Sequence, residues 1–154
     1  MKKYLIIFFL LFNVVNAEVV KNIQIDGNSK ISDDTILVYG DIDLNTDYDT
    51  SQLNEILKKL YSTEFFEDID LSLKNGLLKI NIKEYPTINS IEVEGEKADK
   101  IKEAILKILD LKEKSSFIKS KLSDDINKIK KVYGSLGFTF VKVEAKIENF
   151  NDNR

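Results

Sequence analysis

The segment PTINSIEVEGE, residues 86–96, decides the fold because it repeats a pattern used near the start of the chain. Residues 91–95 read apolar, polar, apolar, acidic, glycine, and residues 23–27 read the same, 91 − 23 = 68 positions earlier. Alternation with a period of two is typical of a half-buried strand, and the glycine indicates a turn after it. The repeat therefore predicts two copies of one small folding unit.

The first seventeen residues have the features of a signal peptide. Lysines follow Met1, residues 4–15 are apolar apart from Asn13, and Val15-Asn16-Ala17 provides a cleavage pattern. A retained membrane anchor is the alternative, but the apolar core is shorter than the about twenty residues that a span requires. We expect residues 1–17 to be removed by cleavage after Ala17.

The composition excludes several classes of function. The chain has 154 residues, 23 lysines and arginines against 26 acidic residues, and neither histidine nor cysteine. This mildly acidic balance argues against nucleic acid as a partner, which requires a cationic surface. Without histidine or cysteine, the usual acid–base, thiol and transition-metal sites lose their common residues. We expect no enzymatic activity, no cofactor and no disulfide.

The first copy reads as strand, helix, helix, strand, strand. Residues 19–26 form the first strand, Ser32 caps a short helix, and Asp49 or Thr50 caps a second, strongly amphipathic helix. Two alternating runs then flank Asn75-Gly76, the dipeptide that favours a type I′ hairpin turn. The pattern predicts an α+β fold with two helices packed on one face of a three-stranded sheet.

The second copy follows the same order but stops early. We expect a strand at residues 88–94, a helix at 98–109, a helix that begins at Ser115 or Ser116 and ends before Gly137, and a strand at 138–147. The last strand is lacking. The open edge that this leaves favours a truncated or partial sequence over a protein that borrows a strand from a partner.

Four segments carry a resemblance to a known family: VVKNIQIDGNSKIS, LKKLYSTEFFEDIDL, LLKINIKEYPTINSIEVEGEK and VYGSLGFTFVKVEAKIENFNDNR. The chain resembles the tandem POTRA (polypeptide-transport-associated) domains of BamA-like outer-membrane assembly factors. The resemblance implies a first domain at residues 18–85, a second, truncated domain at 86–154, and an interdomain seam at Tyr85 and Pro86. One departure is Glu64, which stands where the family usually has glycine.

The resemblance also implies where partners bind. In POTRA domains the strand after the long helix lies at a sheet edge, where an extended chain can pair by β-augmentation. The residues that this assigns are Phe66, Glu67, Asp68, Ile69, Asp70, Leu71, Ser72 and Leu73 in the first copy, and Phe138, Phe140, Lys142, Val143 and Glu144 in the second.

The implied partners are unfolded outer-membrane β-barrel proteins, accessory assembly lipoproteins and periplasmic chaperones. The implied location is the periplasm, tethered to the outer membrane in the full-length parent protein. A docking POTRA module of a two-partner secretion transporter or of a cell-division protein is the alternative. For a division protein, we would expect a single transmembrane helix in place of the signal peptide.

An acidic loop provides a further candidate, a calcium site. Asp41, Asp43 and Asn45 have the spacing of a calcium-binding loop, but Thr46 stands where that loop requires glycine and Gln52 where it requires glutamate. We therefore favour an acidic loop that leads into a helix cap, and expect no metal.

Overall fold

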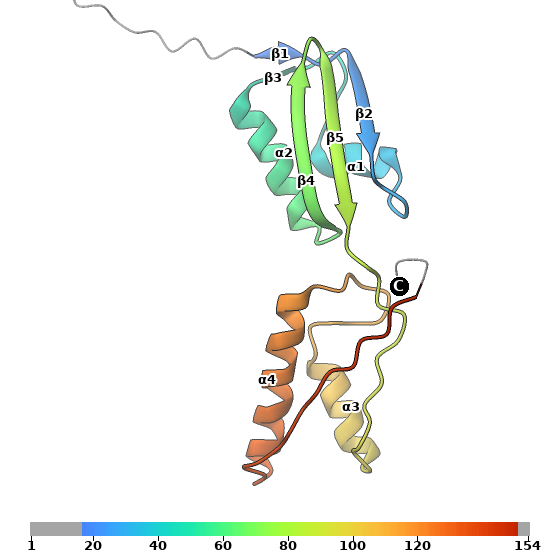
Figure 1. Cartoon of the computed structure of the whole chain (residues 1–154). Coiled ribbons are helices and arrows are strands. Elements are labelled where there is room, and N and C mark those ends of the chain that lie inside the picture. Colours follow the sequence, from blue (N-terminus) through green and yellow to red (C-terminus); the bar gives the residue numbers. More distant parts are fainter. Residues whose placement is uncertain (1–16, 151–154) are drawn as a thin grey trace, which may run out of the picture. The chain divides into compact units, whose positions relative to one another are not determined.

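The computed structural model describes residues 17–150 (Figure 1). Residues 1–16 of the predicted signal peptide lie outside this range, and its last residue, Ala17, is exposed at the start of the described chain. Contacts divide the chain into two compact units, one built from the chain up to Ser62 with Ile69–Ile82, the other from Thr63–Asp68 with Lys83 onward. We call them the sheet unit and the helical unit, and we describe the full length of all three strands of the sheet with the sheet unit.

The sheet unit is built on three strands, β2 (Asn22–Asp26), β4 (Phe66–Lys74) and β5 (Leu77–Glu84). Their order in the sheet is β2-β5-β4, so the last strand in sequence is the central one. β2 runs parallel to β5, with Asn22 opposite Leu77, and β4 runs antiparallel to it (Figure 1). Asn75 and Gly76 have φ values of 53° and 76° between β4 and β5, which confirms the predicted hairpin turn.

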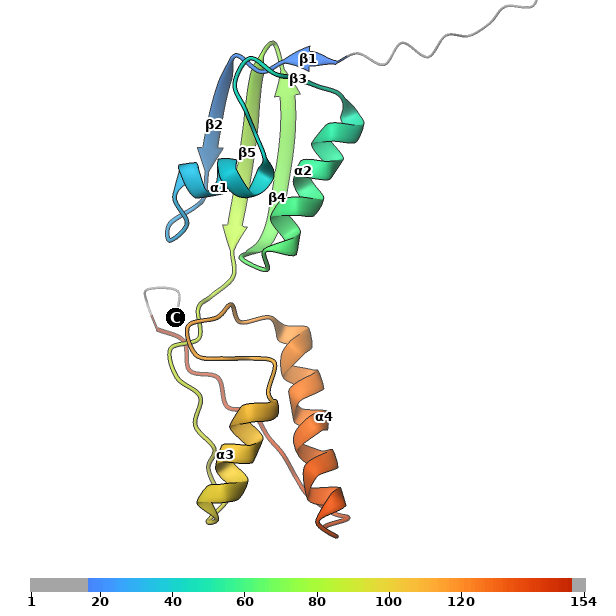
Figure 2. The ribbon, with the colours of Figure 1, turned by 180° about the vertical axis from the view of Figure 1, so that it is seen from behind.

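Helices α1 (Asp33–Gly40) and α2 (Thr50–Ser62) lie on one side of this sheet (Figure 2). Both predicted caps are confirmed. The Ser32 hydroxyl accepts the Thr35 N–H at 3.3 Å. Asp49 and Gln52 form a reciprocal capping pair, in which Oδ1 of Asp49 accepts the Gln52 N–H at 2.8 Å and Oε1 of Gln52 accepts the Asp49 N–H at 2.9 Å.

The two faces of the sheet differ as the alternation predicts. The apolar face and the helices bury a core of Val20, Ile36, Ile42, Tyr48, Ile56, Leu60, Phe66, Ile69, Leu78, Ile80 and Ile82. The opposite face carries cross-strand ion pairs, Lys79 with Asp26 at 3.7 Å and Lys83 with Glu67 at 2.8 Å. Such exposed pairs contribute at most about 1 kcal/mol each, so the apolar face holds the sheet to its helices.

A short backbone pairing before the second helix of each copy, here called the clasp, was not predicted. In the sheet unit it joins β1 (Glu18–Val19) to β3 (Asp47–Tyr48), and in the helical unit it is a bridge between Thr87 and Ser116. Val19 pairs with Asp47, so the offsets between the two clasps are 87 − 19 = 68 and 116 − 47 = 69, within one residue of the sequence repeat. The repeat therefore includes a second pairing that the sequence pattern does not reveal.

The two clasps also share a backbone detail. The Asn45 N–H donates to the Val20 carbonyl at 2.7 Å, and the Lys114 N–H donates to the Ile88 carbonyl at 2.7 Å. Both donor residues are left-handed, with φ values of 61° and 63°. This conformation is uncommon for residues other than glycine, and its occurrence in both copies indicates that the clasp requires it.

The helical unit contains α3 (Asp99–Ile108) and α4 (Lys119–Ser135), and two of its predicted strands are absent. Residues 88–94 and 138–147 are not strands, so the strand predictions for the second copy are wrong. The reason lies in the strand order of the sheet unit. There β5 separates β2 from β4, and in the described part of the helical unit no strand occupies the position of β5. The segments equivalent to β2 and β4 therefore have no ladder partner.

The start of α4 also differs from the prediction. Neither Ser115 nor Ser116 caps it: the helix begins after Ile118, whose side chain forms no capping hydrogen bond. Ser116 takes part in the clasp, and the Ser115 hydroxyl donates to the Lys112 carbonyl at 2.7 Å. The clasp therefore uses the backbone that a serine cap would need.

Gly27 and Gly95, which end the repeated pattern, also reflect the presence of β5 in the first copy and the lack of a described counterpart in the second. Both have positive φ values, 92° and 79°. A Cβ on Gly27 would lie 2.1 Å from the Ile82 carbonyl oxygen of β5, whereas a Cβ on Gly95 would have no heavy atom within 4 Å. Gly27 is thus required by the close approach of β5, and Gly95 only by its own backbone conformation.

We predict that Gly27→Ala destabilises the sheet unit by more than about 2 kcal/mol, because a backbone clash adds to the left-handed strain. Gly95→Ala is the matched control, with an expected loss in the helical unit of about 1–2 kcal/mol from strain alone. Urea unfolding followed by amide NMR signals from each unit would measure both. Equal losses from the two substitutions would contradict this account.

A buried carboxylate joins α4 to the loop that follows α3 in the helical unit. Asp125 on α4 is 2% exposed and accepts the N–H groups of Asp110 and Leu111 at 2.7 and 2.9 Å, together with the Lys128 ammonium at 3.0 Å. Lys128 also pairs with Asp110 at 2.5 Å. Burial alone raises the pKa of Asp125, but these hydrogen bonds outweigh it and hold the pKa below its usual value.

The sign of this pKa shift predicts how the helical unit responds to pH. The lowered pKa stabilises the folded unit above the unfolded pKa of about 3.9, and this contribution is lost as the pH falls through the folded pKa. Asp125→Asn should lower the unfolding free energy at neutral pH by about 2 kcal/mol, because a charged acceptor of two N–H groups is lost.

Thermal unfolding of wild type and variant between pH 7 and pH 2 would test this, with the exposed neighbour Asp124→Asn as control. We expect the difference between wild type and Asp125→Asn to shrink toward pH 2, while Asp124→Asn stays close to wild type. A difference that does not change with pH would show that the Asp125 charge is unimportant.

Candidate strand-pairing site on β4

The outer edge of β4 can be located from one side-chain contact. The Ile69 N–H donates to the Tyr61 hydroxyl at 3.0 Å, and Tyr61 belongs to α2, outside the sheet. The backbone of Ile69 therefore points away from β5. Because backbone direction alternates along a strand, Leu71 and Leu73 also present their N–H and C=O groups at the open edge.

The hairpin turn independently indicates which backbone groups of β4 face β5 and which face the open edge. A two-residue turn at Asn75-Gly76 makes Lys74 and Leu77 a hydrogen-bonded pair, so that Lys74, Ser72 and Asp70 point toward β5. Asp70 also accepts a hydrogen bond from the Asn81 side chain of β5 at 3.2 Å. Both arguments identify Leu71 and Leu73 as the residues whose backbone is open to a new strand.

The start of β4 departs from regular alternation. Phe66 and Ile69 are both buried although they are three residues apart. The Phe65 carbonyl accepts the Tyr85 N–H at 2.9 Å, so Phe65 faces the end of β5, although it is an odd number of residues from Asp70. We infer a β-bulge at Glu67–Asp68, where two residues oppose one. The uneven spacing of Phe66 and Ile69 in the sequence is the signal that could have predicted it.

The residues predicted for the first edge do lie on an edge strand, but their side chains differ in role. Phe66 and Ile69 belong to the core, and Leu71, Ser72 and Leu73 are half-buried. Glu67, Asp68 and Asp70 are exposed, and charges at a bulged edge oppose uncontrolled pairing. The open groups are therefore backbone groups.

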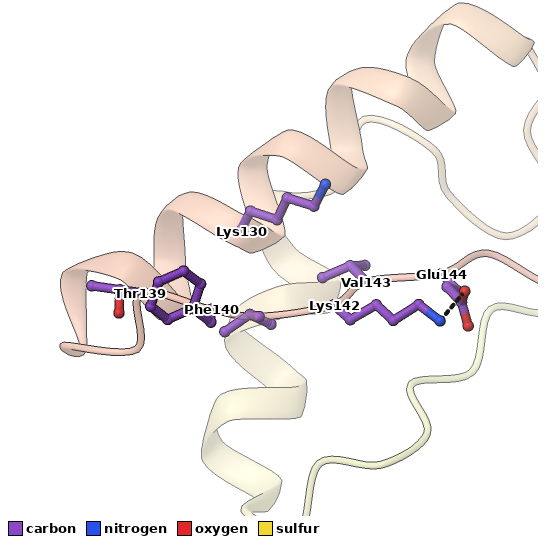
Figure 3. A pocket seen from close by; sticks show the side chains of 7 residues that line it. Lys130, Thr139, Phe140, Lys142, Val143 and Glu144 are labelled. Carbon is purple, nitrogen blue, oxygen red and sulfur yellow. Dashed lines mark ion pairs between the residues drawn. The ribbon is translucent and has the colours of Figure 1, made fainter.

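The residues predicted for the second edge do not form a strand edge. Phe138, Phe140, Lys142, Val143 and Glu144 lie in the irregular segment 138–147. Together with Lys130 of α4, residues 139–144 line a hollow of about 530 Å³ (Figure 3). Lys142 pairs with Glu144 at 2.7 Å, and the Phe140 side chain is fully exposed. An exposed phenylalanine beside an open hollow is not a built binding site.

Glu64, which stands where the resemblance expects glycine, has left-handed geometry with a φ of 59°. The residue lies in the turn between α2 and β4. A non-glycine residue in this conformation costs about 1–2 kcal/mol, so the turn into the candidate edge is strained.

The acidic loop has other contacts in place of a metal. The Asp41 carboxylate pairs with Lys59 at 2.7 Å, and the Asp43 N–H donates to the Tyr48 hydroxyl at 2.9 Å. Lys59 lowers the pKa of Asp41 by its hydrogen bond and its charge. Across residues 17–150, no group of three acidic side chains is close enough to hold a metal ion. Over the same range, no helix has the length and apolar character to cross a membrane.

Comparison with known proteins agrees with this architecture. The POTRA family, described as "Surface antigen variable number repeat", matches residues 86–154. Two curated relatives are described as outer membrane protein assembly factor BamA. The protein from Neorickettsia risticii (strain Illinois) is 28% identical over 117 residues, or 76% of this chain, and that from Neisseria meningitidis serogroup B is 25% identical over 138 residues, or 88%. These matches support a BamA-like POTRA region.

The chain spans only 16% and 17% of the length of these two BamA relatives. The matches confirm the prediction that this POTRA chain is not an enzyme. The boundary predicted between residues 85 and 86 stays a prediction, although the family match begins at residue 86.

Solved POTRA structures share the fold. The N-terminal domain of Omp85 from Thermosynechococcus elongatus has a TM-score of 0.54 at 14% identity, covering 78% of this chain and 52% of that one. The POTRA1-2 structure of Omp85 from Anabaena has a TM-score of 0.50 at 12% identity, covering 90% and 92%. At these identities the likeness concerns the fold alone, and it confirms the predicted α+β class.

Proposed function

We propose that this POTRA chain works in the periplasm and binds extended segments of unfolded outer-membrane β-barrel proteins along β4. The binding mode is strand addition, in which the client pairs with the outward backbone groups of Leu71 and Leu73. The observation that carries the proposal is the position of β4 at the edge of the β2-β5-β4 sheet. The description of both curated relatives as outer-membrane assembly factors supports the choice of client.

The proposed binding is weak and tolerant of sequence. Each added hydrogen bond contributes a net of about 0.5–1.5 kcal/mol, and ordering an unfolded client offsets much of the sum. The resulting dissociation constant is on the order of micromolar to millimolar. Recognition through backbone groups suits clients whose sequences differ, because every residue of the client apart from proline presents the same donor and acceptor.

The proposal concerns the sheet unit only. Residues 138–147, the counterpart of β4 in the second copy, do not form a strand, so a second edge requires a central strand in that unit. We extend the proposal to accessory assembly lipoproteins and periplasmic chaperones, whose exposed strands would compete with clients for the same backbone groups of Leu71 and Leu73.

A proline at Leu71 tests the proposal. Leu71→Pro removes an outward N–H without removing a bond to β5, whereas a proline at Asp70 would break the sheet itself. We expect Leu71→Pro to weaken photo-crosslinking of an extended client peptide to β4 by roughly tenfold, since a hydrogen bond is lost and the ring obstructs the strand.

Leu71→Ala is the matched control, because it shortens the same side chain but keeps the N–H. It should crosslink nearly as well as wild type. Crosslinking at the wild-type level by a folded Leu71→Pro protein would refute strand addition at this edge. An equal loss in Leu71→Ala would place the binding energy in the side chain and not in the backbone.

A further inference from the structure

The contact between Tyr61 and β4 has a consequence for any strand that binds there. Tyr61 lies in the last turn of α2, and its hydroxyl accepts the outward N–H of Ile69 at 3.0 Å. Tyr61 is 42% exposed, so it stands at the surface beside β4. The Ile69 N–H is the first outward-facing donor after the bulge in β4. It is therefore already hydrogen-bonded within the protein.

An added strand would have to displace this contact to reach Ile69. A pairing strand runs about 4.8 Å from its neighbour, which is the region that the Tyr61 hydroxyl occupies beside Ile69. Before Ile69, the bulge at Glu67–Asp68 interrupts regular pairing. After Leu73, the hairpin turn at Asn75-Gly76 ends the strand. The open length of the edge is thus limited at both ends.

We propose that Tyr61 sets the register of the strand that β4 accepts. By occupying the Ile69 N–H, it restricts pairing to the two outward residues Leu71 and Leu73, so that the site takes a short extended segment in one position. This inference rests on the proposed function, since it specifies the length and register of the same site. A client strand cannot slide toward the bulge, because the Tyr61 ring blocks the next position.

The restriction also limits affinity. Loss of the Tyr61 side chain exposes one more donor, and a client that used it would gain one hydrogen bond. That gain corresponds to binding about threefold to tenfold tighter. Tyr61 therefore keeps the edge weak as well as short.

Amide hydrogen exchange in the full chain tests the inference in two steps. In the free protein, the Ile69 amide should exchange at least tenfold more slowly in wild type than in Tyr61→Phe, which keeps the ring but lacks the hydroxyl. Tyr39→Phe, which removes a hydroxyl from α1 of the same unit, is the matched control and should leave Ile69 unchanged. Equal exchange at Ile69 in wild type and Tyr61→Phe would overturn the inference.

The second step adds a synthetic peptide with the sequence of β5, LLKINIKE, as an extended probe. In wild type, the peptide should slow exchange at Leu71 and Leu73 only. In Tyr61→Ala it should bind threefold to tenfold tighter and also protect Ile69. An unchanged affinity and protection pattern in Tyr61→Ala would overturn the register role.

The two proposals fail in different ways. If the peptide protects no β4 amide in either protein, strand addition at this edge is refuted, and the register role falls with it. The contact itself is still measured by exchange at Ile69 in the free protein. If the peptide protects Leu71 and Leu73 but Tyr61→Ala behaves as wild type, strand addition stands and only the register role is lost.

Discussion

The pairing of β5 with both β2 and β4 is the interaction on which the rest of the sheet unit depends. β5 comes last in the unit but occupies the middle of the sheet, so neither neighbour forms a ladder without it. The position of β5 also explains Gly27, because a Cβ at this residue would lie 2.1 Å from the Ile82 carbonyl oxygen. Because β5 is central, β4 is necessarily an edge, and an edge strand is what the proposed function requires.

Within its described residues, the helical unit has the same element order but no central strand. Its described core is small, with Ile105, Leu109 and Leu111 as the buried apolar residues. Polar contacts join other parts of the helical unit. Asp125 accepts hydrogen bonds from the loop between α3 and α4, and the Tyr133 hydroxyl forms a hydrogen bond with Glu96 at 2.5 Å. Phe138 packs edge-on against Tyr133 but stays largely exposed, as does Phe140. The helices and the clasp therefore form without the sheet, but the flanking strands do not.

The features that depend on local chemistry could be predicted from the sequence. The Asn75-Gly76 turn, the Ser32 cap and the amphipathic α2 each follow from residues close in the chain, and each is confirmed. The features that could not be predicted depend on contacts between distant residues. The clasp, the bulge at Glu67–Asp68 and the Tyr61–Ile69 hydrogen bond leave little mark on the pattern of apolar residues. The strands predicted at 88–94 and 138–147 were wrong because alternation indicates a tendency, and a strand also needs a partner.

The proposed client site is smaller than the predicted one, and the difference again depends on contacts that the sequence pattern does not show. The sequence and the resemblance identified all eight residues of 66–73, whereas the geometry reduces the open backbone to Leu71 and Leu73, with Tyr61 as a residue that neither indicated. Of the apolar side chains in this segment, Phe66 and Ile69 belong to the core, and Leu71 and Leu73 are half-buried. The groups left for a partner are main-chain groups, which sequence patterns do not describe.

The most direct measurement is residue-by-residue amide exchange along β4 in the free protein. If β5 is central and β4 an open edge, Leu71 and Leu73 exchange rapidly while Asp70 and Ser72, which donate to β5, are protected. Protection of all four amides would show that another part of the molecule covers this edge. Rapid exchange at Asp70 and Ser72 would show that the β4–β5 ladder itself is not formed as described.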